Sequence, residues 1–420
     1  MSSVSRSFAK LSQREVMAAT SRHEMLFAGR RGGARASFAF YDLSGLDLSG
    51  RNLADADFTG AVLENANFAN TRLESASFFG ADLRRANLVG ATLRRADMRG
   101  ASLRGANLTG ADLYEADLRE GTITQKDRNG NLLAIQHEVG PSELPEAVLR
   151  GANLERARLT GVIAAQADFT DAVMRGCKLQ RANLRQAKLS GVNLEAADLS
   201  GCNLAGADLS GAILVGALLT QTVFDGADMS NTLTDAPTGR DIASLPAPIM
   251  ELLERHARWA ETDGREGSPI DLTEVDLRPL KSLAHRALTA LVAPRVILYG
   301  IDLQGASLQG SNLSGADLRT VRLTGADLRG ANLIGARLNN SDLRDVKMGP
   351  LLISGDRLLP ARLDGAVARY ADFRGADLRR AKVANADFSY TNLADCDLRD
   401  VDLSLATTAG AKLTGTNSRT

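Results

Sequence analysis

Residues 56–120 read ADFTG AVLEN ANFAN TRLES ASFFG ADLRR ANLVG ATLRR ADMRG ASLRG ANLTG ADLYE ADLRE when they are written in blocks of five. The third residue of all thirteen blocks is Phe, Leu or Met, and the first is Ala in every block but one, which has Thr71. A period of five fits neither the 3.6-residue repeat of an amphipathic helix nor the two-residue alternation of a half-buried strand. Self-similarity at a fixed short period is typical of a solenoid built from stacked repeats.

The blocks resemble the A-(D/N)-L-x-x consensus of the pentapeptide-repeat family, and similar blocks cover roughly three quarters of the chain. The resemblance implies an all-β solenoid, the right-handed quadrilateral β-helix, in which each block forms one side and four blocks form a coil of about twenty residues. We expect the large apolar residue and the Ala to point inward, while the next two residues form a corner. Coils should stack at about 4.8 Å. Phe38, Phe58 and Phe78 would then form one interior column, continued by Met98.

The phase of the repeat divides the chain into two similar parts. One register runs over 38–118, a second over 149–229 and a third over 298–413. Each part begins with a segment that lacks the repeat, and we interpret this order as an internal duplication that gives two stacked or tandem solenoids, each led by a short α-helical cap. The expected domains are an N-terminal capping helix with a Gly-rich turn at 1–37, a first solenoid at 38–237 with an insertion at 119–148, a helical leader at 238–297, and a second solenoid at 298–420 interrupted at 349–362.

Helices are predicted at the start of both parts. Ser12 and Glu15 form the S-x-x-E pattern of a capping box, which marks the beginning of a helix. In the second leader, apolar residues at helical spacing follow Pro248, a residue suited to a first helical turn. A further short helix is expected over 281–291.

The two leader segments share a pattern around a histidine. His23 is followed three residues later by Leu26, and His256 is followed three residues later by Trp259. Because the open end of a coil stack must be covered, we expect Leu26 and Trp259 to be buried as structural caps, and a capping role fits both histidines. No helix is predicted after Leu413, so a homodimer through the C-terminal coil and a frayed end on a monomer both remain open.

The insertion contains the strongest short hairpin signal of the chain, Asn129-Gly130, flanked by apolar residues on both sides. This signal predicts a projecting β-hairpin. We expect the hairpin to bind a partner, because long loops on a rigid scaffold often carry function. The candidate partner-binding residues in it are Asn129, Gly130, Leu132 and Ile135. The alternative is a tolerated insertion that only shifts the register of the repeats.

Composition and motifs argue against an enzyme. Fifty basic and fifty acidic residues cancel, so no global charge attracts nucleic acid or an anionic membrane. No nucleophile elbow, phosphate-binding loop or Cys/His metal spacing occurs, so no catalytic residue, cofactor or metal is expected. The three cysteines occupy the position of the inward Ala. There is no apolar run that spans a bilayer and no secretory signal, so the expected location is the cytoplasm.

The leading hypothesis is a non-enzymatic cytoplasmic scaffold that binds another macromolecule, a protein of unknown identity, through its solenoid faces and the projecting loop. The resemblance supplies an alternative, because some pentapeptide-repeat proteins imitate DNA and modulate DNA gyrase or topoisomerase IV. Residues 195–241 carry seven acidic residues against one Arg, and Asp198, Asp208 and Asp228 are the candidate contacts. Direct nucleic-acid binding through the basic residues of 150–188 is disfavoured, because exposed aromatic residues are not interleaved with them.

Overall fold

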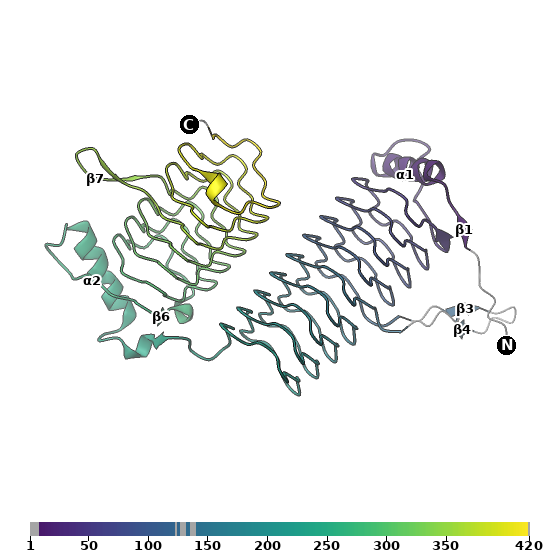
Figure 1. Ribbon diagram of the computed structural model, residues 1–420, viewed down its shortest axis with the longest axis horizontal. Coiled ribbons are helices and arrows are strands. Elements are labelled where there is room, and N and C mark those ends of the chain that lie inside the picture. The colour runs from purple at the N-terminus through teal and green to yellow at the C-terminus, as the bar shows by residue number, and fades with distance from the viewer. Residues whose placement is uncertain (1–7, 122–123, 127–131, 135–139, 419–420) are drawn as a thin grey trace. The chain divides into compact units, whose positions relative to one another are not determined.

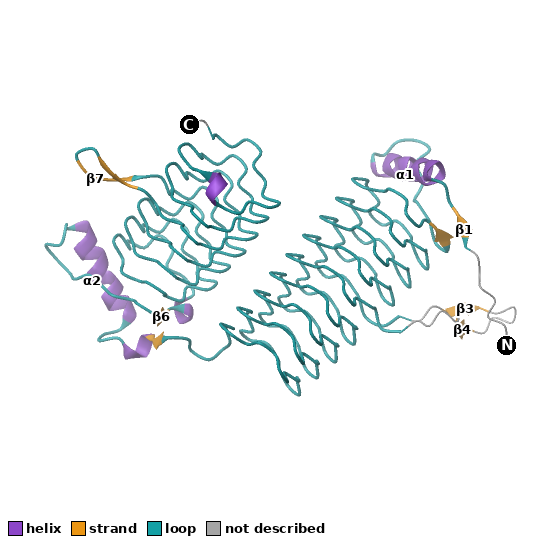
Figure 2. Ribbon diagram, viewed as in Figure 1, coloured by secondary structure: helices purple, strands orange, loops and turns teal. Residues whose placement is uncertain are grey.

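The computed structural model of this chain describes residues 8–121, 124–126, 132–134 and 140–418. The chain divides into two compact units, Met1–Asp235 (unit 1) and Ala236–Thr420 (unit 2). In both units the chain winds in stacked, angular coils, which appear as loops in Figure 2 because each side is too short to count as a strand. Figure 1 shows that the two long helices, α1 (Gln13–Phe27) and α2 (Ile249–Glu261), belong to the early part of unit 1 and of unit 2, respectively.

The coils are held together by ladders of parallel bridges between residues twenty positions apart. Four such ladders run along unit 1, starting at Ser37, Asp42, Asp47 and Asn52. At one rung, the N–H of Phe58 donates to the carbonyl of Ser77 at 2.7 Å. Buried backbone groups are therefore satisfied by the coils above and below, as a solenoid without long strands requires. This is the four-sided β-helix that the resemblance to pentapeptide-repeat proteins implies.

Corners follow each inward pair of residues. The N–H of Ala61 donates to the carbonyl of Phe58 at 3.0 Å and closes one such turn. The residue before that Ala takes a left-handed conformation, as in Gly60 with φ of 60°. The backbone geometry explains why Gly recurs at this position, since a left-handed φ costs a side chain about 1–2 kcal/mol.

The interior of each coil is filled as expected, with Ala and a large apolar residue from every side. Phe38, Phe58 and Phe78 are at most 1% exposed, and Met98 is fully buried. The ring centroids of Phe38 and Phe58 are 5.2 Å apart and those of Phe58 and Phe78 are 4.8 Å apart, with the second pair nearly parallel. The predicted aromatic column is confirmed.

Polar residues at the small inward position use a recurring hydrogen bond. Thr71 Oγ1 donates to the carbonyl of Leu48 at 2.8 Å, and Cys177 Sγ donates to the carbonyl of Leu154 at 2.7 Å. Both acceptors lie 23 positions earlier, in the preceding coil. The same contact is made by Cys202, Thr222, Thr232, Ser341, Thr391 and Cys396. The small inward position therefore accepts a hydroxyl or thiol without leaving a buried donor unpaired.

Unit 1 begins with strand β1 (Ala9–Lys10), which pairs in parallel with β2 (Tyr41–Asp42), and helix α1 (Gln13–Phe27) between them. The predicted capping box is confirmed, because Ser12 Oγ accepts from the N–H of Glu15 and the Glu15 carboxylate accepts from the N–H of Ser12. In the insertion, β3 (Thr124–Lys126) pairs antiparallel with β4 (Leu132–Ala134), which confirms paired strands there.

The cap of unit 1 is centred on His23, and the expectation for Leu26 is wrong. Leu26 is 46% exposed, whereas His23 is fully buried. The N–H of Ala36 donates to Nδ1 of His23 at 3.0 Å, so the ring proton lies on Nε2, which faces the carbonyl of Ala54 at 2.8 Å. The helical spacing brings the histidine onto the covered face of α1, and this rotation leaves Leu26 at the margin.

Unit 2 repeats this order of elements. Strand β5 (Arg240–Asp241) pairs in parallel with β6 (Val275–Asp276), and between them lie a 3₁₀ turn (Ile242–Ser244) and helix α2 (Ile249–Glu261). Further along come two 3₁₀ turns, Arg278–Leu280 and Leu403–Leu405, and the hairpin of β7 (Leu351–Ser354) and β8 (Arg357–Leu359).

His256 repeats the contacts of His23, while Trp259 is only half-buried, so its predicted burial is also wrong. The N–H of Ile270 donates to Nδ1 of His256 at 3.3 Å, and Nε2 faces the carbonyl of Thr289 at 3.1 Å. The ring of Trp259 packs on the His256 ring with centroids 5.5 Å apart. Trp259 therefore shields the histidine from outside and does not enter the coil.

The helix expected over 281–291 is absent, and the coils of unit 2 begin earlier than 298. Leu283 and Leu288 are buried inward residues, and Ser282 bridges to Asp302 in a coil ladder. One extra residue is accommodated at the 3₁₀ turn Arg278–Leu280, where Lys281 has φ of 59°. This single extra residue shifts the register of the repeat. The first repeats of unit 2 are therefore out of phase with the later ones, and the five-residue period alone does not reveal them.

Candidate interaction surfaces

The structure only partly describes the residues predicted in the first insertion. Asn129, Gly130 and Ile135 lie outside the described residues, and Leu132 is the first residue of β4. The ladder passes from Asp117 directly to Arg158, so the insertion leaves the coil stack at a corner and returns to the same stack. Its role in partner binding therefore stays a prediction.

The three predicted acidic contacts do not form one patch. Asp208 and Asp228 are consecutive rungs of one ladder, whereas Asp198 belongs to a ladder with Lys178 and Leu218. Because Asp198 and Asp208 are ten residues, or two coil sides, apart, they face opposite directions across the four-sided coil. A cluster of charges in the sequence is spread around the solenoid by its period.

Each of these carboxylates also has a local structural contact. The side chains of Asp198, Asp208 and Asp228 accept the backbone N–H of the serine two residues later, at 2.9–3.1 Å. The hydrogen bond from the Ser200 side chain lowers the pKa of Asp198, and the one from the Ser230 backbone lowers the pKa of Asp228. The repeated aspartate thus stabilises the corner that follows it.

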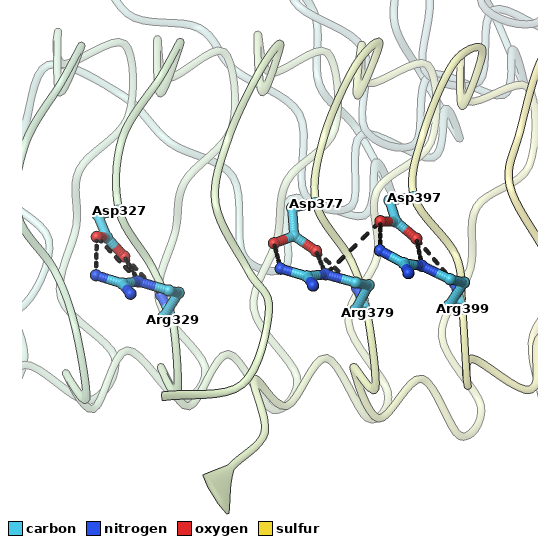
Figure 3. A network of polar contacts seen from close by, with 6 residues as sticks. All are labelled: Asp327, Arg329, Asp377, Arg379, Asp397 and Arg399. Atoms are coloured by element: carbon cyan, nitrogen blue, oxygen red, sulfur yellow. Dashed lines mark hydrogen bonds and ion pairs between the residues drawn. The ribbon is translucent and has the colours of Figure 1, made fainter. Parts of the chain in front are cut away.

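In many coils an arginine takes the place of that serine and forms a bidentate ion pair with the aspartate, which we call an Asp–Arg fork. Arg379 donates to both carboxylate oxygens of Asp377 at 2.8 Å, as Figure 3 shows beside the forks of Asp327 and Asp397. Arg379 Nε also lies 3.6 Å from Asp397 of the next coil. Other forks join Asp82–Arg84, Asp97–Arg99, Asp117–Arg119, Asp276–Arg278, Asp317–Arg319, Asp342–Arg344 and Asp372–Arg374.

The forks neutralise the faces on which they lie. The hydrogen bond from Arg399 lowers the pKa of Asp397, and the hydrogen bond to Asp377 raises the pKa of Arg379, so both hydrogen bonds favour the charged form of these two groups. The solvent-exposed forks add at most about 1 kcal/mol each to stability, whereas the forks of Arg278 and Arg319 are largely buried. The main effect of the forks is that a face rich in aspartate has little net charge.

The hairpin β7–β8 is anchored on the coil stack by one of its two sides. Leu351 and Leu359 are a cross-strand pair and are partly buried. A Cβ placed on Gly330 would lie 2.8 Å from Leu351 Cβ and 3.1 Å from a methyl carbon of Leu359. The hairpin therefore sits directly on the backbone of this corner, where only glycine leaves room.

The other side of this hairpin is apolar and exposed. Leu352 and Leu358 form the next cross-strand pair and are 61% and 40% exposed, and Ile353 is 49% exposed. The interruption of the repeat at 349–362 is visible in the sequence, but no role was predicted for it. Two apolar runs around Ser354-Gly355-Asp356 resemble a hairpin, and this signal was available in the sequence.

The described residues offer little for catalysis. They contain no group of three or more His, Cys, Asp and Glu side chains placed to hold a metal ion. The three cysteines are buried, and burial raises the pKa of Cys202 and of Cys396 to about 12, so neither is a thiolate at neutral pH. Neither α1 nor α2, nor another helix in the described part, is long and apolar enough to cross a membrane.

Comparison with known proteins identifies a family and several solved structures. The family model described as pentapeptide repeats (8 copies) matches residues 42–80, 81–120, 142–176, 167–204, 177–214, 202–232, 295–325, 312–348, 361–383 and 384–417. The pentapeptide-repeat protein Rfr23 from the cyanobacterium Cyanothece 51142 is 31% identical over 32% of this chain and 91% of its own, with a TM-score of 0.27.

Two other solved structures match at lower identity. HetL from Nostoc sp. strain PCC 7120, involved in the regulation of heterocyst differentiation, is 21% identical over 94% of this chain and 92% of its own, with a TM-score of 0.16. Full-length QnrB1, a plasmid-mediated fluoroquinolone resistance protein, is 18% identical over 48% of this chain and 92% of its own, with a TM-score of 0.24. No curated protein matches the chain.

Proposed function

Because this chain belongs to the pentapeptide-repeat family, we propose that it is a non-enzymatic scaffold that binds another protein through elements projecting from its coils. The observation that carries this proposal is the hairpin β7–β8. It is fixed to the stack by Leu351 and Leu359 and presents Leu352, Ile353 and Leu358 to solvent. Exposed apolar side chains on an anchored, projecting element are typical of a protein-binding surface.

The architecture of the chain supports a role in which two binding surfaces are carried together. We propose two tandem solenoids that arose by duplication, each led by a helix whose buried histidine bonds to the first coil. The cytoplasm is the proposed location. A homodimer through the C-terminal coil, where Leu413 is exposed, belongs to the same proposal.

A capture experiment tests the proposed function. Immobilised protein is incubated with native cytoplasm, and the bound proteins are compared for the wild type, the double variant Leu352→Asp/Leu358→Asp and the control Leu405→Asp. Leu405 is an exposed leucine of the same unit but lies outside the hairpin. We expect one or more partners to be lost with the double variant and kept with the control. Retention of every partner by the double variant would contradict a role for β7–β8.

A second arm tests the first insertion, which remains our other candidate for recognition. Residues 121–140 are excised and the flanking coils are joined. We expect loss of a partner with nearly unchanged thermal stability, because removing a long surface segment costs a coil stack little. A large fall in melting temperature would show instead that the insertion is part of the stack.

Modulation of DNA gyrase or topoisomerase IV is the second candidate function, and the stacking of two aspartates on consecutive coils favours it. Asp208 and Asp228 are neighbouring rungs of one ladder, in which Lys188 is the rung before Asp208. A mimic of DNA needs a continuous acidic face, since the duplex carries about one charge per 1.7 Å. Supercoiling by purified gyrase, with and without a quinolone, is the test, and Asp208→Asn/Asp228→Asn is the variant. No effect of the wild type at micromolar concentration removes this candidate.

A further inference from the structure

A groove on one face of unit 1 gathers cations from successive coils. The groove has a volume of about 530 Å³, and its lining includes four arginines, Arg95, Arg99, Arg156 and Arg158. Three carboxylates, Asp97, Glu115 and Asp117, also line it. The ladder Asp97–Asp117–Arg158–Lys178 forms its floor and continues it by one coil. We use the name basic strip for Arg95, Arg156, Arg158 and Lys178.

The two aspartates of the groove are already engaged within the fold. Asp97 and Asp117 form forks with Arg99 and Arg119, with closest N–O distances of 2.7 Å. Asp117 is also 3.8 Å from Arg158 Nη1. Each aspartate is therefore neutralised by its own fork before it meets the basic strip.

The cations of the basic strip have few partners. In the part of the chain that the structure describes, the side chains of Arg95 and Lys178 form no ion pair, and both are exposed. Arg156 and Arg158 reach their nearest carboxylates only at 3.9 Å and 3.8 Å. These long contacts contrast with 2.7 Å in the forks beside them. The local balance of charge in the groove is therefore positive, although the whole chain is neutral.

The stacking of Arg158 on Lys178 is unfavourable for the solenoid itself. The two are adjacent rungs of one ladder, and neighbouring coils are separated by about 4.8 Å. Like charges directly opposite each other destabilise a sheet. Asp117 precedes Arg158 and Asp198 follows Lys178 in the same ladder, so these two carboxylates offset part of the repulsion. An anionic group bound between the two cations would offset the remainder.

The cation at the edge of the groove is held in a defined position. Arg156 Nη1 donates to the hydroxyl of Tyr114 at 3.0 Å, and its guanidinium lies 6.0 Å from the centre of that ring. Arg94 covers the same ring at 4.4 Å. A preordered guanidinium loses less entropy on binding a carboxylate than a free one does.

From this arrangement we infer that the basic strip binds an acidic segment of a protein partner, with its carboxylates between Arg156, Arg158 and Lys178. The inference rests on the proposed scaffold function and names the chemistry of one partner surface. An acidic peptide fits better than a nucleic acid, because the Tyr114 ring is covered by arginine and cannot stack on a base.

The test measures binding of a fluorescein-labelled peptide of twelve residues with six glutamates to the full-length protein by fluorescence anisotropy. We expect saturable binding with a dissociation constant below about 1 mM, and we expect this binding to weaken as added salt screens the charges. The variant Arg156→Gln/Arg158→Gln should weaken it about tenfold or more, since two charged hydrogen bonds are lost. Lys178→Gln should weaken it about threefold. Because Lys178 has no ion pair in the described residues, this variant keeps the test valid if the double variant unfolds.

The matched control is Arg185→Gln/Lys188→Gln, which removes the same charge from exposed residues on other sides of unit 1. Unchanged binding by this control supports the basic strip, and an equal loss overturns it in favour of general attraction. No binding by the wild type, or tighter binding of a twelve-nucleotide DNA than of the peptide, also overturns the inference. If the peptide fails while partners are still captured through β7–β8, the proposed function stands and this inference falls.

Discussion

At the scale of single residues, His23 and His256 connect each cap helix to its coil through both ring nitrogens. In both, Nδ1 accepts a backbone N–H and Nε2 faces a backbone carbonyl. This arrangement requires the neutral imidazole, because a proton on Nδ1 would face another donor. Burial lowers the pKa of both histidines from the ordinary value.

The pH dependence of stability follows from this pKa shift. The unfolded chain has histidines with a pKa of about 6.5 and binds protons more readily than the native state does. The stabilisation is therefore complete above about pH 6.5 and is lost as the pH falls below it. We expect the Tm to decline on acidification, with a flatter profile in His23→Gln/His256→Gln. His285→Gln, at an exposed histidine, should retain the wild-type profile. Circular dichroism measures all three.

The interior register is tested by a lysine. Leu88 is fully buried, whereas its neighbour Val89 is partly exposed at the corner. Leu88→Lys places a charge in an apolar interior without a partner and should cost several kcal/mol. Val89→Lys should have little effect. Equal melting temperatures for the two variants would show that the assignment of inward and outward positions is wrong.

At the scale of elements, the anchoring of β7–β8 depends on one glycine. Gly330 and Gly335 both have a left-handed φ, of 68° and 66°, but a Cβ would meet the hairpin only at Gly330, and it would meet nothing within 4 Å at Gly335. Gly330→Ala and Gly335→Ala should share a conformational cost of about 1–2 kcal/mol. Only the first should lift the hairpin, so that trypsin cleaves faster after Arg357. Similar cleavage rates in both variants would contradict the proposed anchor.

At the scale of the whole molecule, the buried apolar residues form one separate cluster in each unit. We therefore expect residues 1–235 and 236–420 to fold when expressed separately. Trp259 is the only tryptophan of the chain and belongs to unit 2. Its fluorescence should report the same unfolding midpoint in the full chain and in the C-terminal fragment. Aggregation of both fragments would show that neither unit is stable alone.

The inward positions, which repeat every five residues, could be predicted from the sequence. Which face of a helix is covered and which side of the coil a charged residue occupies were not predicted correctly. The inward column of Phe58 and Phe78 follows from spacing alone and is confirmed. The burial of His23 in preference to Leu26 depends on the rotation of α1, which the residue pattern leaves undetermined. Asp198 was grouped with Asp208 because of proximity along the chain, but five-residue sides place them on opposite faces. Charges counted over a stretch longer than one five-residue side therefore belong to different faces of the solenoid.

The corners of this solenoid accommodate insertions of very different length, with 21, 10 and 1 extra residues. Ladder steps of 20 become 41 between Asp117 and Arg158, 30 between Lys347 and Asp377, and 21 between Asp271 and Val292, yet the stack continues each time. Because the additional chain leaves and returns at one corner, its length is independent of the core. Equivalent corners of successive coils therefore offer attachment positions spaced by about 4.8 Å along the stack. A recognition segment transplanted from one corner to the equivalent corner of another coil would change its position along the stack by a multiple of this spacing, while the interior sequence stays the same.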